Sequence, residues 1–215
     1  MNLLVWGLGY VGSVSSACFS KIGFKVTGID KDKNKIKLFN SGICPIDEPD
    51  VENLLVEAGK KNLFNASAIL PKSLDEYECS LICVGTPSKE NGEPDLSFLK
   101  SVCKDIGSLL INSNKFHNVI IRSTVFPGTT RNILKNIIED TSGKKVGVDF
   151  GIVMNPEFLR EATAVKDFFN PPYTILGGYD SNSTNIASKL YESIKVDIYN
   201  VKIEEAEILK MVNNA

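Results

Sequence analysis

The chain has 215 residues, of which 43% are hydrophobic, and a formal net charge of −2 at pH 7. This length allows one large domain, or one domain with a fragment of a second. The charge balance gives no electrostatic footprint for nucleic acid, and no apolar run reaches the length of a membrane span. The N-terminus leads directly into an apolar run without the features of a signal peptide, so we expect a cytoplasmic protein.

The cysteines and the single histidine offer no pattern for a metal site. The five cysteines are Cys18, Cys44, Cys79, Cys83 and Cys103. Cys79 and Cys83 are four residues apart among apolar neighbours, which on a strand places them on one face. Buried free thiols are therefore favoured over a disulfide or a zinc site. We predict that His117, in a polar stretch before a strand, is an ordinary surface residue.

The most informative stretch of the chain is its beginning, residues 3–30. An apolar run ends at Gly7, and Gly9 and Gly12 complete a G-x-G-x-x-G pattern before a predicted helix. Gly7 permits a tight turn, Gly9 lets the backbone approach a pyrophosphate, and Gly12 lets helix and strand pack closely. The N-terminus of the helix then faces the phosphates. The alternative interpretation is a glycine-rich turn that binds nothing.

An acidic residue completes this dinucleotide pattern. Asp30 ends the second apolar run, 21 residues after Gly9, where its carboxylate can accept hydrogen bonds from a ribose diol. A carboxylate there repels a 2′-phosphate, so the sequence predicts NAD rather than NADP. Lys35 lies within reach of the adenosine end of such a ligand. A solvated helix face is an equally good interpretation of Lys35.

The remaining pattern alternates strands and helices. Helices are predicted at 31–40, 50–60, 73–77, 95–111, 127–139 and 183–193, and strands at 66–70, 80–84, 118–121, 152–154, 173–176 and 196–200. This alternation predicts an α/β fold with a doubly wound parallel sheet. Thr86 and Thr124 follow two of the strands. Because ligands of such sheets bind at the carboxyl ends of the strands, we expect both threonines in the crevice beside Gly9.

A second informative stretch covers residues 151–178. Pro156 suits the first position of a helix, and Glu157 and Glu161 are four residues apart on its expected first turn. Both carboxylates would then share one face. Spacing alone leaves a functional pair and two solvated acids near a helix N-terminus equally open.

The end of the chain predicts a helix that stops in mid-pattern. Residues 203–215 carry an apolar stripe, and Lys210 and Asn214 lie four apart on one face. No cap follows before Ala215. We therefore expect a dinucleotide-binding domain over 1–202 and, over 203–215, the start of a truncated connecting helix.

Several segments together resemble one family, the nucleotide-sugar 6-dehydrogenases, which include UDP-glucose and GDP-mannose dehydrogenases. The matching segments are GLGYVG (7–12), Asp30, CVGTPS (83–88), DLS (95–97), RSTVFPGT (122–129), NPEFLREATAVKDF (155–168) and EEAEILKMVNN (204–214). SKENGEPDL (88–96), DTSGKKVGVDFG (140–151) and Pro171-Pro172 resemble the GDP-mannose branch. The implied substrate is therefore GDP-mannose, with UDP-glucose as the near alternative. A stand-alone NAD-binding module without catalysis is a further alternative.

The resemblance implies two successive NAD-linked oxidations of a sugar C6 alcohol to a carboxylate. Glu157 would activate the hydrolytic water with Thr124 nearby, and Lys210 and Asn214 would hold the developing oxyanion at C6. Implied NAD contacts, beside the three glycines, are Tyr10, Val11, Asp30, Lys35, Thr86 and Thr124. Implied substrate contacts are Phe158, Leu159, Arg160, Glu161, Lys210 and Asn214.

One departure from the family is large. The family traps the aldehyde on a cysteine in a glycine-rich motif beyond the central helix, and none of the five cysteines here has that context. We expect this chain to be the N-terminal portion of such an enzyme, able to bind NAD but not to complete the four-electron oxidation. The resemblance implies that the full-length enzyme is a homodimer or larger assembly through the central helix.

Overall fold

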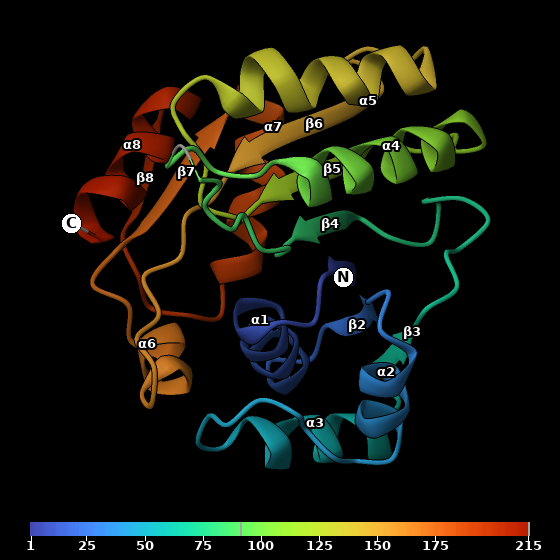
Figure 1. The fold of residues 1–215 in the computed structure, drawn as a ribbon, viewed down its shortest axis with the longest axis vertical. Helices are drawn as coiled ribbons and strands as arrows, with labels where there is room; N and C mark the ends of the chain where they lie inside the picture. The colour runs from blue at the N-terminus through green and yellow to red at the C-terminus, as the bar shows by residue number, and fades with distance from the viewer. Residues whose placement is uncertain (91, 215) are drawn as a thin grey trace.

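The computed structural model describes residues 1–90 and 92–214, apart from the side chain of Asn214. One eight-stranded sheet, in the order β3-β2-β1-β4-β5-β6-β7-β8, forms its centre (Figure 1). The strands are β1 (Asn2–Trp6), β2 (Lys25–Ile29), β3 (Phe64–Ser67), β4 (Cys79–Ile82), β5 (His117–Ile121), β6 (Phe150–Met154), β7 (Thr174–Gly178) and β8 (Ile198–Val201). β6 and β7 pair antiparallel, whereas the other neighbouring strands pair parallel. The predicted α/β fold is confirmed, with β7 and β8 running against the first six strands.

Helices cover both faces of the sheet. They are α1 (Tyr10–Lys21), α2 (Lys33–Asn40), α3 (Val51–Lys60), α4 (Ser97–Ile111), α5 (Lys135–Ser142), α6 (Ala164–Phe169), α7 (Ser181–Ser188) and α8 (Ile203–Asn214). Helical turns at Thr130–Leu134 and Lys189–Tyr191 precede α5 and follow α7. None of the described helices is long and apolar enough to cross a membrane. The predicted helix at 73–77 is wrong, because these described residues form turns.

Two hydrophobic cores lie on opposite faces of the sheet because side chains alternate along each strand. In β1, Leu3 and Val5 face the core beneath α1, α3, α6 and α7. Leu4 and Trp6 face the core beneath α4, α5 and α8. Burying both faces explains why the strands read as nearly continuous apolar runs. The predicted division at residue 202 stays a prediction.

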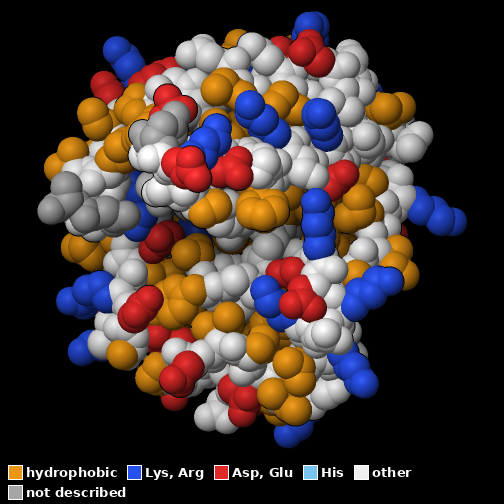
Figure 2. All heavy atoms as spheres, in the orientation of Figure 1, with side chains coloured by type: hydrophobic (Ala, Val, Ile, Leu, Met, Phe, Trp, Pro, Cys, Tyr) orange, Lys and Arg blue, Asp and Glu red, His pale blue; other side chains and the backbone are white. Residues whose placement is uncertain are grey.

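The side of the molecule drawn in Figure 2 mixes the two signs of charge. Lys and Arg side chains are interspersed with Asp and Glu, and hydrophobic side chains lie between them (Figure 2). This distribution agrees with the formal net charge of −2. All five cysteines are free thiols, and four of them are buried.

The predicted surface position of His117 is wrong. His117 belongs to β5, as its first residue, and not to the polar stretch before that strand. Its side chain is 1% exposed. Its Nδ1 lies 2.9 Å from the Tyr77 carbonyl oxygen, and its Nε2 lies 2.9 Å from Ser80 Oγ. Trp6 Nε1 also donates to Ser80 Oγ, at 3.0 Å. A neutral imidazole that donates from Nδ1 and accepts at Nε2 satisfies both contacts.

Burial of His117 predicts a loss of stability in mild acid. Burial lowers the pKa of His117 to about 4 from an ordinary value of 6.5. The unfolded chain therefore binds a proton between these values that the folded chain excludes, and stability falls as pH drops from about 6.5 toward about 4. The full effect is about 3 kcal/mol. In urea unfolding at pH 7 and pH 5, His117→Gln should reduce this fall. An equal fall in both proteins would contradict the prediction.

Candidate functional site

The glycine-rich turn joins β1 to α1 at the carboxyl edge of the sheet. Gly7 has a φ of +90°, a conformation that favours glycine, and a Cβ there would lie 2.9 Å from Val84 Cγ1. A Cβ on Gly12 would lie 1.8 Å from the carbonyl oxygen of Gly7. A Cβ on Gly9, by contrast, would meet no described atom within 4 Å. The N-cap residue of α1 is Gly9, which has no side chain to cap the helix. The turn is thus tightly packed at Gly7 and Gly12 and has free space beside Gly9.

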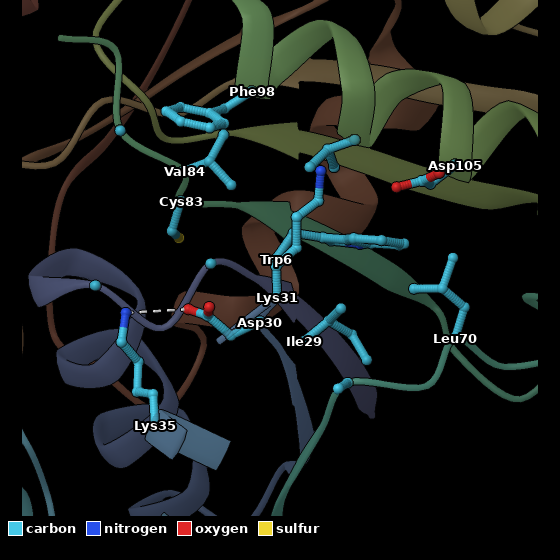
Figure 3. A pocket seen from close by; sticks show the side chains of 15 residues that line it. Trp6, Ile29, Asp30, Lys31, Lys35, Leu70, Cys83, Val84, Phe98 and Asp105 are labelled. Atoms are coloured by element: carbon cyan, nitrogen blue, oxygen red, sulfur yellow. Dashed lines mark hydrogen bonds and ion pairs between the residues drawn. The ribbon is translucent and has the colours of Figure 1, made fainter. Parts of the chain in front are cut away.

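A cavity of about 480 Å³ lies against this turn, between the α1–β2 side and α4 (Figure 3). Its lining includes four of the predicted site residues, Gly7, Gly9, Asp30 and Lys35. The remaining lining residues are Trp6, Ile29, Lys31, Ala68, Leu70, Cys83, Val84, Gly85, Phe98, Val102 and Asp105. Most of these residues are apolar. A largely apolar cavity with a few charged side chains suits a ligand with a flat ring system and polar groups.

Asp30 lines the cavity beside the glycine-rich turn. One carboxylate oxygen, Oδ2, accepts from Leu8 N at 2.8 Å and pairs with Lys35 Nζ at 3.3 Å (Figure 3). The other, Oδ1, accepts from Asp32 N at 3.0 Å. Burial opposes the charge of Asp30, but these backbone hydrogen bonds and Lys35 outweigh it and lower its pKa. The carboxylate is therefore ionised at neutral pH and held in one orientation.

Residues of α4, which were not predicted from the sequence as site residues, line the opposite wall. Phe98, Val102 and Asp105 follow the i, i+4, i+7 spacing of one helix face. This spacing, on the helix that follows the loop after β4, was the sequence signal from which these lining residues could have been found. Lys31 Nζ donates to Ser101 Oγ at 3.1 Å, which links the end of β2 to α4 beside the cavity.

The two predicted threonines lie together. Thr86 Oγ1 donates to the Thr124 carbonyl oxygen at 2.8 Å, which ties the loop after β4 to the loop after β5. Thr86 and Thr124 are not among the described residues that line the 480 Å³ cavity, and neither are Tyr10 and Val11.

Glu157 and Lys210 form a buried ion pair between the segment after β6 and α8. Glu157 Oε1 lies 2.8 Å from Lys210 Nζ, and the two side chains are 9% and 6% exposed. Glu157 Oε2 accepts from Leu159 N at 2.7 Å. Lys210 Nζ also lies 5.8 Å from the centre of the Phe158 ring. Two residues about fifty positions apart in the sequence are thus in direct contact. The side chain of Asn214 lies outside the described residues.

The predicted helix from Pro156 is wrong, because residues 155–163 form a loop and α6 begins at Ala164. Ala162 has a φ of +68°, which no right-handed helix allows. Carboxylates accept the hydrogen bonds that a helix would have used. Leu159 N donates to Glu157, Arg160 N donates to Asp167, and Ala162 N and Ala164 N donate to Glu48. Glu157 and Glu161 therefore do not share a helix face, and Glu161 is exposed.

A second cavity, of about 340 Å³, lies against this 155–163 loop. Three of the predicted substrate contacts, together with the predicted base Glu157, contribute to its lining, whereas Glu161 and Lys210 do not. Glu157, Phe158, Leu159 and Arg160 line it directly, together with Arg122, Asn155, Pro156, Asp167, Phe168, Asn170, Pro171, Pro172, Tyr173, Thr174, Tyr191 and Asn213. Arg160 is forked onto Asp167, with Nη2 to Oδ1 at 2.7 Å.

Helix α8 is anchored by two further acidic residues. Glu207 is fully buried and accepts from Gly128 N at 2.6 Å and Thr130 N at 2.7 Å. Glu204 pairs with Arg131 Nε at 2.6 Å. These contacts fix the helix against the loop and the helical turn that follow β5. Lys210, one turn further along α8, is thereby held beside Glu157.

The chain is similar to known proteins over its whole length. Residues 1–195 match the model of the UDP-glucose/GDP-mannose dehydrogenase family, NAD binding domain. GDP-mannose 6-dehydrogenase of Pseudomonas putida is 44% identical over 214 residues, which is 100% of this chain and 49% of that protein. UDP-glucose 6-dehydrogenase of Haloferax volcanii is 34% identical over 220 residues, 100% of this chain and 51% of that protein. The chain thus spans about half the length of the curated relatives it matches.

The solved structures show the same relationship in three dimensions. A ternary complex of GDP-mannose dehydrogenase from Pseudomonas aeruginosa superposes with a TM-score of 0.97 at 42% identity, covering 100% of this chain and 49% of that one. A UDP-glucose dehydrogenase from Pyrobaculum islandicum gives a TM-score of 0.93 at 30% identity, covering 99% and 49%. The chain therefore belongs to the UDP-glucose/GDP-mannose dehydrogenase family and contains its NAD-binding domain.

Proposed function

We propose that this chain is the NAD-binding part of a nucleotide-sugar 6-dehydrogenase that oxidises the C6 alcohol of GDP-mannose to a carboxylate. The buried pair of Glu157 and Lys210 carries the proposal, because an isolated cofactor domain has no structural need for two charges out of water. GDP-mannose is preferred because the six relatives at 41–44% identity are named as GDP-mannose 6-dehydrogenases. UDP-glucose is the alternative, supported by the 34% identical relative.

The first cavity fits NAD. The open space beside Gly9 and the uncapped N-terminus of α1 suit a pyrophosphate, and the fixed carboxylate of Asp30 suits a ribose diol. We propose that Lys35 assists at the adenosine end, and that Tyr10, Val11, Thr86 and Thr124 contact NAD away from the cavity lining.

The ion pair of Glu157 and Lys210, with the neighbouring 155–163 loop, suits the chemistry at the sugar. NAD, when bound, supplies the hydride acceptor. We propose that Glu157 takes a proton from the hydrolytic water, with Thr124 nearby, and that the Leu159 amide fixes its orientation. Lys210 would stabilise negative charge on the C6 oxygen, together with Asn214. We propose Phe158, Leu159, Arg160 and Glu161 as sugar contacts.

The thiols of this chain do not suit the covalent step of a four-electron oxidation. Burial raises the pKa of Cys18, Cys79, Cys83 and Cys103 to about 12 in each case. Burial also raises the pKa of Cys44. A thiol attacks a carbonyl as the thiolate, which these values disfavour at neutral pH. The 215 residues alone should therefore bind NAD and form no sugar acid.

The only tryptophan of the chain makes NAD binding measurable. Trp6 lines the first cavity, so bound NADH should quench its emission by energy transfer, with saturation. The same sample, given NAD with GDP-mannose or UDP-glucose, should form no acid product. Absence of saturable quenching would contradict the cofactor assignment, and acid product would contradict the assignment of the thiols.

A chimera tests the substrate. Residues 1–215 would replace the matching half of the Pseudomonas putida GDP-mannose 6-dehydrogenase, which covers this whole chain. The chimera should oxidise GDP-mannose, and Glu157→Gln should stop it from releasing acid. A folded chimera that binds NADH but leaves GDP-mannose unchanged would overturn the proposed substrate.

Asp30 should contribute strongly to NAD affinity. Asp30→Ala removes hydrogen bonds to a charged group, so we expect NAD binding to weaken by about 1–3 kcal/mol. Isothermal titration measures this change. Lys35→Met is the comparison variant: it removes the 3.3 Å ion pair and the proposed contact at the adenosine end but leaves the Asp30 carboxylate in place, so it should cost less. Unchanged NAD affinity in a folded Asp30→Ala protein would remove Asp30 from the site.

A further inference from the structure

A single carboxylate connects the glycine-rich turn with the 155–163 loop. Glu48 lies in the segment between α2 and α3 and is 6% exposed. Its Oε2 accepts from Tyr10 Oη at 2.6 Å and from Ala162 N at 2.7 Å. Its Oε1 accepts from Ala164 N at 2.8 Å. Three hydrogen bonds thus converge on one buried charge from two segments about 150 residues apart in the sequence.

Tyr10 lies directly beside the glycine-rich turn. It is the first residue of α1 and directly follows Gly9. Its hydroxyl also lies 3.3 Å from the Arg160 carbonyl oxygen, a second acceptor on the 155–163 loop. Burial, and then the hydrogen bond to Glu48, raise the pKa of Tyr10. The phenol therefore remains a donor at neutral pH, and a shift of α1 would change its contact with Glu48.

Glu48 also holds a strained part of the loop. The left-handed conformation of Ala162 is unfavourable for a residue with a side chain and persists only where neighbouring groups enforce it. The amides of Ala162 and Ala164 both donate to Glu48, and hydrogen bonds to a charged group are stronger than those between neutral groups. The strain is thus offset by this one carboxylate, and the loop conformation beside Glu157 depends on it.

We propose that Glu48 is a positioning residue that couples occupancy of the cofactor turn to the conformation of the 155–163 loop. NAD seated against α1 fixes Tyr10, Tyr10 fixes Glu48, and Glu48 fixes the loop that carries Glu157. The inference rests on the proposed seating of NAD beside Gly9. Since coupling between two sites is reciprocal, loosening the loop must also weaken NAD binding.

The first test is amide hydrogen exchange at Ala162 and Ala164 in the 215-residue chain, with and without NAD. Glu48→Gln keeps the size of the side chain but leaves one carbonyl acceptor for the two amides and the Tyr10 hydroxyl. We expect exchange at these amides to rise about fivefold or more, in the range of typical coupling. Asp47→Asn is the matched control, because it neutralises an exposed neighbouring carboxylate. NAD should slow exchange at both amides in the wild type and in Asp47→Asn, but much less in Glu48→Gln.

The second test is a double-mutant cycle on NAD affinity. Tyr10→Phe and Glu48→Gln should each weaken NAD binding several-fold, and the double variant should be no weaker than the worse single variant. If the losses of NAD affinity in the two single variants multiplied in the double variant, the proposed coupling would be overturned. Unchanged amide exchange in Glu48→Gln would overturn it as well. If the wild type bound no NAD, the proposed function would fail. Faster exchange in Glu48→Gln without NAD would then still show that Glu48 holds the loop, but the coupling would be overturned.

Discussion

Gly12→Ala should destabilise the fold more than any other single methyl group added to the glycine-rich turn. The added Cβ would lie 1.8 Å from the Gly7 carbonyl oxygen and 3.3 Å from Cys83 Cβ. The first of these atoms belongs to the backbone of a tight turn, so no side-chain rotation relieves the overlap. Overpacking of this kind costs about 3 kcal/mol or more. Urea unfolding, followed by circular dichroism, measures the loss, and a midpoint equal to that of the wild type would contradict it.

Gly9→Ala is the matched control for this prediction. The same methyl group at Gly9 meets no described atom within 4 Å, so the free energy of unfolding should change by less than about 1 kcal/mol. The methyl would, however, occupy the space through which a pyrophosphate approaches the backbone. NADH should therefore no longer quench Trp6 in a protein that is still folded. The two glycines separate packing from binding within one motif.

The glycine-rich turn could be predicted because its determinants are local. Gly7, Gly9 and Gly12 lie within six residues, and Asp30 ends the next strand, so the strand–turn–helix unit fixes their relative positions. Its wall on α4 was missed because the spacing of Phe98, Val102 and Asp105 marks one face of a helix but does not state that this face covers the turn. The direction of β7 was also missed, since the pattern of apolar residues is the same for parallel and antiparallel strands.

The 155–163 loop could not be predicted because distant residues determine it. Proline, the acidic first turn and the following apolar spacing all favour a helix from Pro156. Glu48, 114 residues before Ala162, supplies acceptors that make the loop favourable instead. His117 was misplaced for a similar reason, because its buried partners, Tyr77 and Ser80, are about forty residues away. Local propensity decided neither case.

Lys210→Met should destabilise the protein by about 3 kcal/mol, the second large effect expected here. The substitution keeps an unbranched side chain of similar length but leaves Glu157 as a buried carboxylate with only the Leu159 amide as a described hydrogen-bond partner. Removing one partner of a buried pair costs about 3–5 kcal/mol. Helix α8 cannot readily move away to expose Glu157, because Glu207 and Glu204 fix its preceding turns.

The double variant Glu157→Gln, Lys210→Met distinguishes a buried charge from lost packing. Without either charge no uncompensated carboxylate remains, so the double variant should recover to within about 1 kcal/mol of the wild type in urea unfolding. Lys135→Met is the control, since the Lys135–Glu139 pair is more exposed, at 20% and 15%, and lies within one helix. It should cost less than about 1 kcal/mol. If the double variant is as unstable as Lys210→Met, the lysine stabilises α8 by packing. That result would mean that the unpaired Glu157 carboxylate does not lower the free energy of unfolding. The buried pair would then no longer support the proposed catalytic role.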